Sequence, residues 1–173
     1  SDKVNPISQY GTTKRKGETS LLALAPEAII IRTAWLYSSF GHNFLKTMLA
    51  KADTSQDIKV VCDQIGTPTY ARDLANAIVK VIQSHQWVPG IYHFTNEGAA
   101  SWYDFAKAIF RIAGINKNVL PIPTEDYPTA AKRPSYSILD RSRIKATYGV
   151  EIPHWEESLS DCIRLMKQNE KIK

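Results

Sequence analysis

The chain has 173 residues, of which 43% are hydrophobic and 23% are charged, and its formal net charge is +5 at pH 7. This length suits one domain of ordinary size, and the composition excludes a disordered or fibrous chain. No apolar run is long enough to span a bilayer, and the first residues lack the apolar core of a signal peptide, so we expect no membrane partner. The basic residues are scattered, whereas nucleic-acid-binding proteins usually carry a dense basic stripe, so we expect no nucleic-acid partner.

The cysteines and histidines show no spacing typical of a metal or redox site. Cys62 and Cys162 belong to no CxxC or Cys/His cluster, and we interpret them as reduced thiols of a cytoplasmic protein. The four histidines stand apart in the sequence, so the sequence predicts no metal site.

Predicted helices and strands alternate along the chain. In chain order they are a helix over 6–25, a strand over 27–37, a helix over 42–52, a strand over 57–63, a helix over 69–85, a strand over 90–96, a helix over 102–114, and closing helices over 140–149 and 154–169. Thr67 or Thr69 is expected near the cap of the third helix, while Ser101 and Gly114 should begin and end the fourth. Residues 121–134 carry four prolines and should be irregular.

This alternation predicts an α/β fold with a mainly parallel sheet. The continuous apolar run within 27–37 is typical of a strand buried on both faces. A GxGxxG turn is absent from the sequence, and Gly11 and Gly17 lie inside a helical pattern rather than in a phosphate-binding turn. If the fold binds a nucleotide cofactor, we therefore expect most of that binding half to lie outside this chain.

Tyr10 and Lys14 lie four residues apart in the segment NPISQYGTTKRKGET. On a helix this spacing places both side chains on nearly the same face, one turn apart. An ammonium group beside a phenol favours the phenolate, which lowers a pKa that starts near 10. Such a tyrosine can donate a proton to a ketone oxygen during hydride transfer. The spacing alone also occurs on ordinary polar helix faces.

Four blocks of the sequence give this pair a context. NPISQYGTTKRKGE resembles the YxxxK block of the extended short-chain dehydrogenase/reductase family. Three further blocks are similar to those of the dTDP-4-dehydrorhamnose reductases within that family, in the same order: IIIRTAWLYSSFGHNFLKTML, VVCDQIGTPTYARDLANAI and AAKRPSYSILDRSRI.

The resemblance implies a partial Rossmann-like parallel sheet with helices plus a C-terminal substrate-binding lobe, without the N-terminal dinucleotide-binding half. It places the end of the Rossmann-like part at 4–35 and a mixed substrate-binding lobe at 36–173. It further implies NADPH-dependent reduction of dTDP-4-dehydro-L-rhamnose to dTDP-L-rhamnose, with NADH as the alternative cofactor. Because the family's glycine-rich turn and its catalytic Ser or Thr are absent from this chain, we expect it to be inactive alone and to hold NADPH only weakly. A homodimer is possible.

The resemblance also implies roles for individual residues. Tyr10 would protonate the C4 carbonyl oxygen of the sugar, and Lys14 would assist it and bind the nicotinamide ribose. Thr33 and Ala34 would lie beside the nicotinamide, and Ala34 replaces a serine that is usual in the family. The residues expected to contact the nucleotide-sugar are Trp35 at the deoxysugar ring, Asn43, the thymidine-site residues Gln64, Gly66, Pro68 and Thr69, and Arg133 at the diphosphate.

Each substrate-binding residue also has a purely structural interpretation. Trp35 could be a half-buried core aromatic, Asn43 a helix N-cap, and residues 64–69 an ordinary strand-to-helix turn. Arg133 could lie in a solvated loop. Two other functions remain open: a non-catalytic relative resembling the regulatory subunit of methionine adenosyltransferase, or an epimerase or dehydratase for another nucleotide-sugar.

Overall fold

The computed structural model describes residues 4–52, 56–129 and 133–170. Its α-helices are α1 (Gln9–Leu24), α2 (Phe44–Ala50), α3 (Ala71–Ile82), α4 (Trp102–Ala113), α5 (Ser142–Tyr148) and α6 (Trp155–Glu170), with a 3₁₀ turn, η1, at Thr124–Asp126. The strands are β1 (Ile29–Arg32), β2 (Leu36–Tyr37), β3 (Ile58–Val61), β4 (Ile65–Gly66), β5 (Thr69–Tyr70), β6 (Gly90–His93), β7 (Ala100–Ser101) and β8 (Val119–Ile122).

The strands pair two by two. β1 pairs with β6, β2 with β5 and β3 with β8, all in parallel, whereas β4 and β7 are antiparallel. Parallel pairing requires a crossover between the strands, and α3 lies within the connection from β1 to β6. The predicted α/β class with mainly parallel pairing is therefore confirmed.

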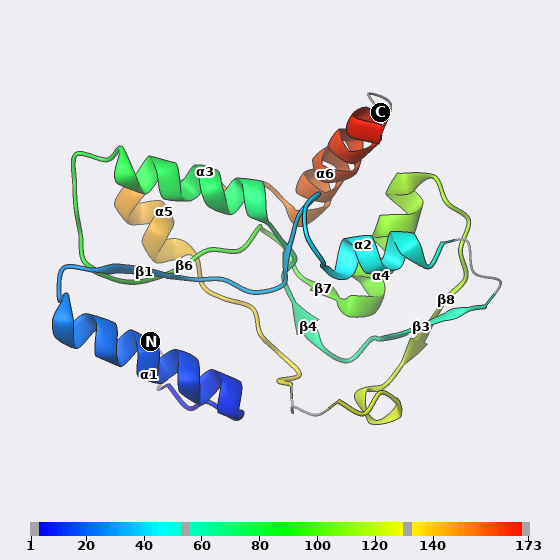
Figure 1. Cartoon of the computed structure of the whole chain (residues 1–173), viewed down its shortest axis with the longest axis horizontal. Helices are drawn as coiled ribbons and strands as arrows, with labels where there is room; N and C mark the ends of the chain where they lie inside the picture. Colours follow the sequence, from blue (N-terminus) through cyan, green and yellow to red (C-terminus); the bar gives the residue numbers. More distant parts are fainter. Residues whose placement is uncertain (1–3, 53–55, 130–132, 171–173) are drawn as a thin grey trace.

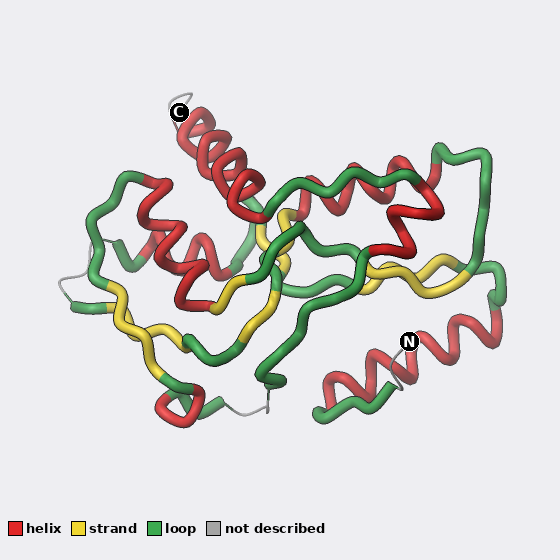
Figure 2. Tube along the Cα trace, turned by 180° about the vertical axis from the view of Figure 1, so that it is seen from behind, coloured by secondary structure: helices red, strands yellow, loops and turns green. Residues whose placement is uncertain are grey.

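Helices cover both faces of the β1–β6 pair. Figure 1 shows α3 and α5 on one face and α1 on the other, and Figure 2 shows the same layers from behind. The core beneath α3 and α5 is formed by buried side chains of α3, β6, α5 and the segments beside them: Ala77, Val81, Tyr92, Phe94, Ile144, Tyr148 and Val150.

A second core lies at the other end of the molecule, where α4 packs against α2, α6, β3 and β8 (Figure 1). Its centre is aromatic and aliphatic, and Leu45, Phe105, Ile109 and Leu159 are almost completely buried there. The amphipathic pattern of α4 explains this position, because its apolar face meets both α2 and α6. The short strands β4, β5 and β7 join the two cores.

The ends of α4 follow the prediction from sequence. Ser101 forms a capping box with Asp104, in which each side chain accepts a hydrogen bond from the other residue's backbone N–H. Gly114 ends the helix with φ of 75°, a left-handed conformation that glycine adopts without strain.

Two element predictions were wrong in part, whereas the expectation for the start of α3 was met. The strand expected over 27–37 ends at Arg32 and resumes only at Leu36, because Trp35 takes a left-handed conformation with φ of 50°. The expected threonine near the cap of α3 is present, because Thr69 directly precedes the cap residue Tyr70, which makes no side-chain cap bond. Within the expected irregular segment 121–134, residues Pro121 and Ile122 belong to β8, because β8 pairs there with β3.

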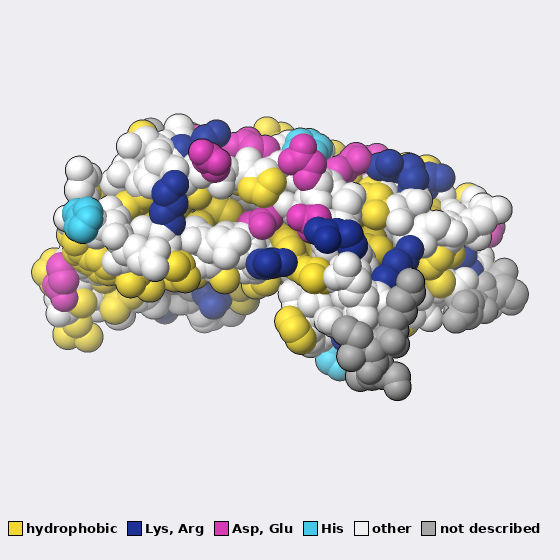
Figure 3. All heavy atoms as spheres, turned by 90° about the horizontal axis from the view of Figure 1, so that it is seen from above, with side chains coloured by type: hydrophobic (Ala, Val, Ile, Leu, Met, Phe, Trp, Pro, Cys, Tyr) yellow, Lys and Arg dark blue, Asp and Glu magenta, His cyan; other side chains and the backbone are white. Residues whose placement is uncertain are grey.

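The surface carries exposed apolar side chains at the end that holds α3. Ile78, Val79 and Ile82 on α3 and Trp87 and Val88 after it are all exposed. In Figure 3 hydrophobic side chains gather over this part of the molecule, on the left. None of the helices within the described ranges is long and apolar enough to cross a bilayer.

Candidate functional site

Tyr10 and Lys14 both project from α1 into solvent. The helix begins where the Ser8 hydroxyl accepts a hydrogen bond from the Gly11 N–H at 3.1 Å, which places Tyr10 in the first turn. Tyr10 is 69% exposed, and the Lys14 ammonium lies 5.6 Å from the centroid of its ring. The two side chains therefore lie together on one face of α1, as the spacing predicted.

α1 is held to the sheet by an ion pair rather than by a buried apolar face, since α1 has no buried residue. Glu18 accepts hydrogen bonds from Arg32 Nε at 2.7 Å and from Arg32 Nη2 at 2.6 Å. The bonds from Arg32 hold the pKa of the Glu18 carboxyl below its ordinary value, although partial burial opposes this shift. The arrangement fixes the register of the Tyr10 helix against β1.

A cavity of about 230 Å³ lies between α2, β3 and the start of α4. Its apolar and aromatic lining includes Phe44, Met48, Ile58, Val60 and Trp102. Its polar lining comprises Thr47, Lys51, Lys59, Gln64, Thr129 and Arg133, and Tyr127 adds an aromatic ring with a hydroxyl group. Among the described lining residues three are basic and none is acidic, so the cavity favours an anionic ligand with a flat apolar part.

Two predicted substrate-binding residues meet in this cavity although they lie far apart in the sequence. Gln64 is only 7% exposed and donates a hydrogen bond from Nε2 to the Thr124 hydroxyl at 3.1 Å, which orients its side chain. Thr124 is in turn fixed by Asp63, whose carboxylate accepts bonds from the Thr124 N–H and hydroxyl. Arg133 lies exposed at the rim. This gives the cavity one oriented amide and one cation that can form paired hydrogen bonds.

Trp35 and Gly66 contact each other beside the cavity. A Cβ atom placed on Gly66 would lie 2.5 Å from Trp35 Cε2 and 2.8 Å from Ser137 Oγ, so the protein itself requires glycine here. The Trp35 indole stacks on Trp102, with 3.6 Å between ring centroids and 10° between the planes. The pair therefore joins the loop after β1 to the wall of the cavity, because Trp102 lines that cavity.

Thr69 and Asn43 support neighbouring backbone. Thr69 is completely buried and its N–H donates to the Trp35 carbonyl at 3.0 Å; its hydroxyl has no hydrogen-bond partner among the described residues. Asn43 caps α2 by accepting from the Lys46 N–H, and its amide donates to the Ser38 and Phe40 carbonyls. The structural interpretation of Asn43 is thus confirmed, and contact of either residue with a ligand stays a prediction.

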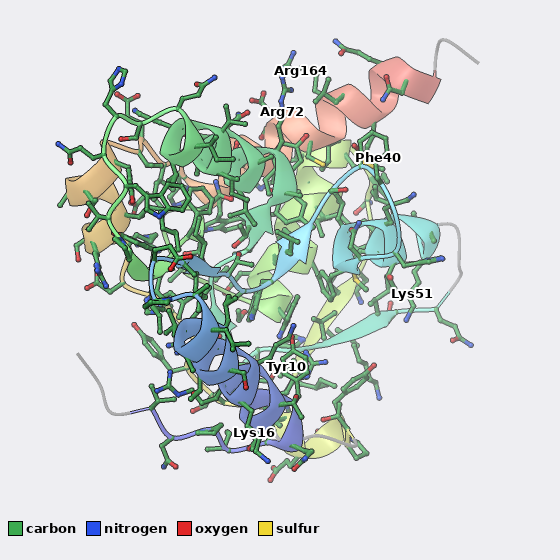
Figure 4. The ribbon with its side chains drawn as sticks, turned by 60° about the vertical axis from the view of Figure 1, so that its left-hand side comes forward. Tyr10, Lys16, Phe40, Lys51, Arg72 and Arg164 are labelled. Carbon is green, nitrogen blue, oxygen red and sulfur yellow. The ribbon has the colours of Figure 1, made fainter. Side chains whose placement is uncertain are left out.

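The structure does not bring Tyr10 and Lys14 into the cavity of Gln64 and Arg133. Lys14 instead lines an open groove of about 480 Å³ between α1 and β1, together with Gly17 and Ile30. In Figure 4 Tyr10 on α1 and Lys51 at the cavity lie in separate parts of the view. Thr33 and Ala34 follow β1 directly, with Thr33 exposed and Ala34 half-buried. In the sequence, Thr33 and Ala34 lie between the Tyr10–Lys14 pair and Trp35, which contacts a wall of the cavity.

Three residues that the sequence did not single out also line the cavity: Trp102, Phe44 and Tyr127. Trp102 and Phe44 are also in contact with each other, with ring centroids 4.7 Å apart. Both fall at apolar positions of predicted helices, where a core role is the usual interpretation. No local signal separated Trp102 from a core aromatic, because its contacts with Trp35 and Phe44 join residues of separate elements.

Cys62 and Cys162 are both free cysteines. Burial raises the pKa of the Cys162 thiol to about 11, so this thiol is inert in the folded protein. Within the described ranges no group of three or more His, Cys, Asp or Glu side chains is placed to hold a metal ion.

Comparison with known proteins shows the family to which the chain belongs. A family model described as the RmlD substrate binding domain matches residues 1–168. The chain is 42% identical over 170 residues to the dTDP-4-dehydrorhamnose reductase of Aggregatibacter actinomycetemcomitans, covering 92% of this chain and 58% of that protein. The chain therefore belongs to the RmlD substrate-binding-domain family, which confirms the resemblance seen in its sequence.

Solved structures agree with this assignment. The crystal structure of a dTDP-4-dehydrorhamnose reductase from Clostridium acetobutylicum superposes with a TM-score of 0.90 at 47% identity, covering 96% of this chain and 58% of that chain. The enzyme of the same name from Bacillus anthracis, solved in complex with NADP, gives a TM-score of 0.87 at 40% identity, covering 95% and 57%. The chain thus spans a little more than half the length of these relatives.

Proposed function

We propose that this chain supplies the dTDP-sugar site of an enzyme that reduces dTDP-4-dehydro-L-rhamnose to dTDP-L-rhamnose with NADPH. The observation that carries the proposal is the cavity in which Gln64 and Arg133 meet an aromatic wall. Relatives named dTDP-4-dehydrorhamnose reductase support the substrate class. A relative solved with NADP supports the cofactor, although NADH remains an alternative for this chain.

The cavity suits a nucleoside diphosphate on chemical grounds. Trp102, Phe44 and Tyr127 offer ring faces on which a thymine base can stack. Arg133 can bind the diphosphate through two parallel hydrogen bonds, and Lys51 and Lys59 add positive charge nearby. Gln64, held by Thr124, offers an amide to the thymine edge. Gly66, Pro68 and Thr69 shape this site from behind, and Asn43 fixes its helix α2.

The sugar would extend from this cavity towards the end of β1. Trp102 lines the cavity and stacks on Trp35, and Trp35 follows Thr33 and Ala34 directly. An indole face suits a deoxysugar ring that carries a methyl group. This path leads from the nucleotide cavity to the edge of the sheet where ligands of parallel α/β folds bind, beyond the carboxyl ends of the strands.

Tyr10 and Lys14 supply the acid chemistry in this proposal. NADPH, when bound, supplies the hydride that reaches C4 of the sugar. The Tyr10 hydroxyl donates its proton to the C4 oxygen, and the ammonium of Lys14 stabilises the phenolate that remains. The pair also suits a nicotinamide ribose, because the side chains of Tyr10 and Lys14 are exposed and are able to form hydrogen bonds with the hydroxyl groups of a ribose. Thr33 and Ala34 would border the nicotinamide.

We also propose that this chain alone does not complete the reaction. Its β1–β6 pair is only two-stranded within the described residues, and the sequence holds no GxGxxG turn for a cofactor diphosphate. The open edge of β1 is also where a second copy could associate. We place the protein in the cytoplasm, in keeping with its two unpaired cysteines.

Calorimetric titration of the chain with dTDP tests the proposal. We expect one binding site, and Arg133→Ala should weaken binding about tenfold because a charge-assisted hydrogen-bond pair is lost. Arg164→Ala is the matched control, because Arg164 is an exposed arginine on α6 whose partner is Asp161 and it does not line the cavity. Figure 4 shows Arg164 at the opposite end of the view from Tyr10.

Failure of the folded chain to bind dTDP, or equal losses in both variants, would contradict the proposed site. When NADPH and dTDP-4-dehydro-L-rhamnose are added to the same samples, the absorbance of NADPH should not fall, because the chain alone should not oxidise it. Turnover at an ordinary enzymatic rate would show that the chain needs no further cofactor-binding segment.

A further inference from the structure

Trp102 both lines the nucleotide cavity and stacks on Trp35. The centroid of its indole lies 3.6 Å from that of Trp35, and the two rings are nearly parallel. The ring centroid of Phe44 lies 4.7 Å from that of Trp102. Ser101 fixes the backbone beneath it through the capping box of α4. Trp102 is therefore more firmly held than a residue on a loop.

Trp35, by contrast, sits in a loop and in a costly backbone conformation. Its φ of 50° lies in the left-handed region, which a bulky side chain adopts only when its surroundings enforce it. Two features provide that enforcement: the stack on Trp102 and the close approach of Gly66, whose missing side chain leaves room for the indole. The Thr69 N–H further holds the Trp35 carbonyl.

We infer that Trp102 is a positioning residue for the sugar: it holds Trp35 in the orientation in which the indole receives the deoxysugar ring. The inference rests on the proposed function. According to this inference, the indole of Trp35 is held in place by Trp102 and by the space that Gly66 leaves. Replacing Trp102 or Gly66 should therefore have the same effect on the sugar as removing the Trp35 indole. A residue that contacted the sugar by itself would instead contribute independently.

The sugar-specific part of the affinity separates these cases. We compare dissociation constants for dTDP and for dTDP-L-rhamnose by calorimetry, because their ratio cancels any direct contact between Trp102 and the nucleotide. In the unchanged chain dTDP-L-rhamnose should bind about tenfold more tightly than dTDP. Trp35→Ala and Trp102→Ala should each bring this ratio close to one, and the double variant should lower it no further.

Two milder series guard against loss of folding. Trp102→Phe keeps an aromatic surface and should retain part of the ratio. Gly66→Ala should lower the ratio as Trp102→Ala does, because its Cβ would displace the indole. Gly17→Ala is the matched control, because Gly17 is an exposed glycine of α1 with no atom near the position of an added Cβ; the ratio should not change.

Each result decides between specific alternatives. If the double variant lowers the ratio of the two dissociation constants by the product of the single effects, the positioning role of Trp102 is wrong. The proposed dTDP site would not be affected by this result. An unchanged chain that binds dTDP but does not prefer dTDP-L-rhamnose would also overturn it. Absence of dTDP binding altogether would overturn the proposed function, and the positioning role would fall with it.

Discussion

Asn96 is the residue that ties the sheet end of the molecule to the α6 end. It is completely buried, and its side-chain oxygen accepts a hydrogen bond from the Tyr70 N–H at 2.8 Å. Its amide donates to Asp73 at 2.7 Å, to Ser158 at 2.8 Å and to the Pro153 carbonyl at 3.2 Å. These partners belong to the starts of α3 and α6 and to the segment before α6. The hydrogen bonds therefore fix two helix starts relative to β6.

Asn96→Ala should lower the free energy of unfolding by about 2 to 4 kcal/mol, because it leaves the buried Tyr70 N–H without a partner and removes one of the two hydrogen bonds to the Asp73 carboxylate, which keeps the bond from Ser158. Urea denaturation followed by circular dichroism measures this change. Asn76→Ala, at an exposed position of α3, is the control and should change the free energy by less than about 0.5 kcal/mol. Equal effects of the two substitutions would contradict the role assigned to the Asn96 network.

Single residues also show where sequence reasoning reached its limit. The role of Asn43 as an N-cap followed from its place before an apolar helix, because capping is a local interaction. The stack of Trp35 on Trp102 could not be read in this way, since it joins residues from separate elements. Gly66 was correctly singled out as a point of close approach, but the approaching group is Trp35 rather than a ligand in this structure.

At the scale of elements, α1 differs from the other helices because no residue of it is buried. The strongest described tether between α1 and β1 is the bidentate bond of Arg32 to Glu18, and Arg15 of α1 itself also donates to Glu18. Position of the Tyr10–Lys14 pair therefore depends on one ion pair. A partly buried bidentate pair of this kind contributes about 1 to 2 kcal/mol.

Docking of α1 should weaken at acid pH. The hydrogen bonds from Arg32 lower the pKa of Glu18 in the folded state. The contribution of Glu18 is therefore complete above the ordinary pKa of 4.5 and is lost as the pH falls through the lower folded-state value. Hydrogen exchange should show early loss of protection in α1 as the pH falls, while α4 remains protected.

Glu18→Gln should produce the same loss of protection at neutral pH. Glu156→Gln is the matched control, since Glu156 pairs with Arg111 at a site where both side chains are largely exposed and the pair adds little. Protection of α1 that persists in Glu18→Gln would show that another contact holds this helix.

Element boundaries were predictable where local chemistry sets them. Ser101 and Gly114 predicted both ends of α4, because a capping box and a left-handed glycine are local signals. The break in the strand after Arg32 was not predicted, because apolar residues resume at Ala34 and the left-handed conformation of Trp35 accompanies contacts with residues distant in the sequence. β8 was missed because Pro121 suggested irregular structure, although a proline without a donor is tolerated in a strand that has one partner.

At the scale of the whole molecule, the sequence predicted the α/β class and the open sheet, and the structure shows a two-stranded pair with an unpaired side to β1 within the described residues. The residues of α3 that are apolar and exposed belong to a chain that spans a little more than half the length of its relatives. The relative placement of Tyr10 and the cavity could not be predicted, since it depends on how the two cores pack. The division at residue 35 stays a prediction.

The most direct test uses the indole N–H signals of the four tryptophans in a nuclear magnetic resonance titration with dTDP-L-rhamnose. Trp102 and Trp35 should shift together with one affinity, because they form the wall between the nucleotide cavity and the sugar. Trp87, which donates to the Glu27 carbonyl near the far end of α3, should not move. Shifts of Trp87 with Trp102 and Trp35 unchanged, or no shifts in the folded chain, would contradict the assignment of this cavity as the dTDP-sugar site.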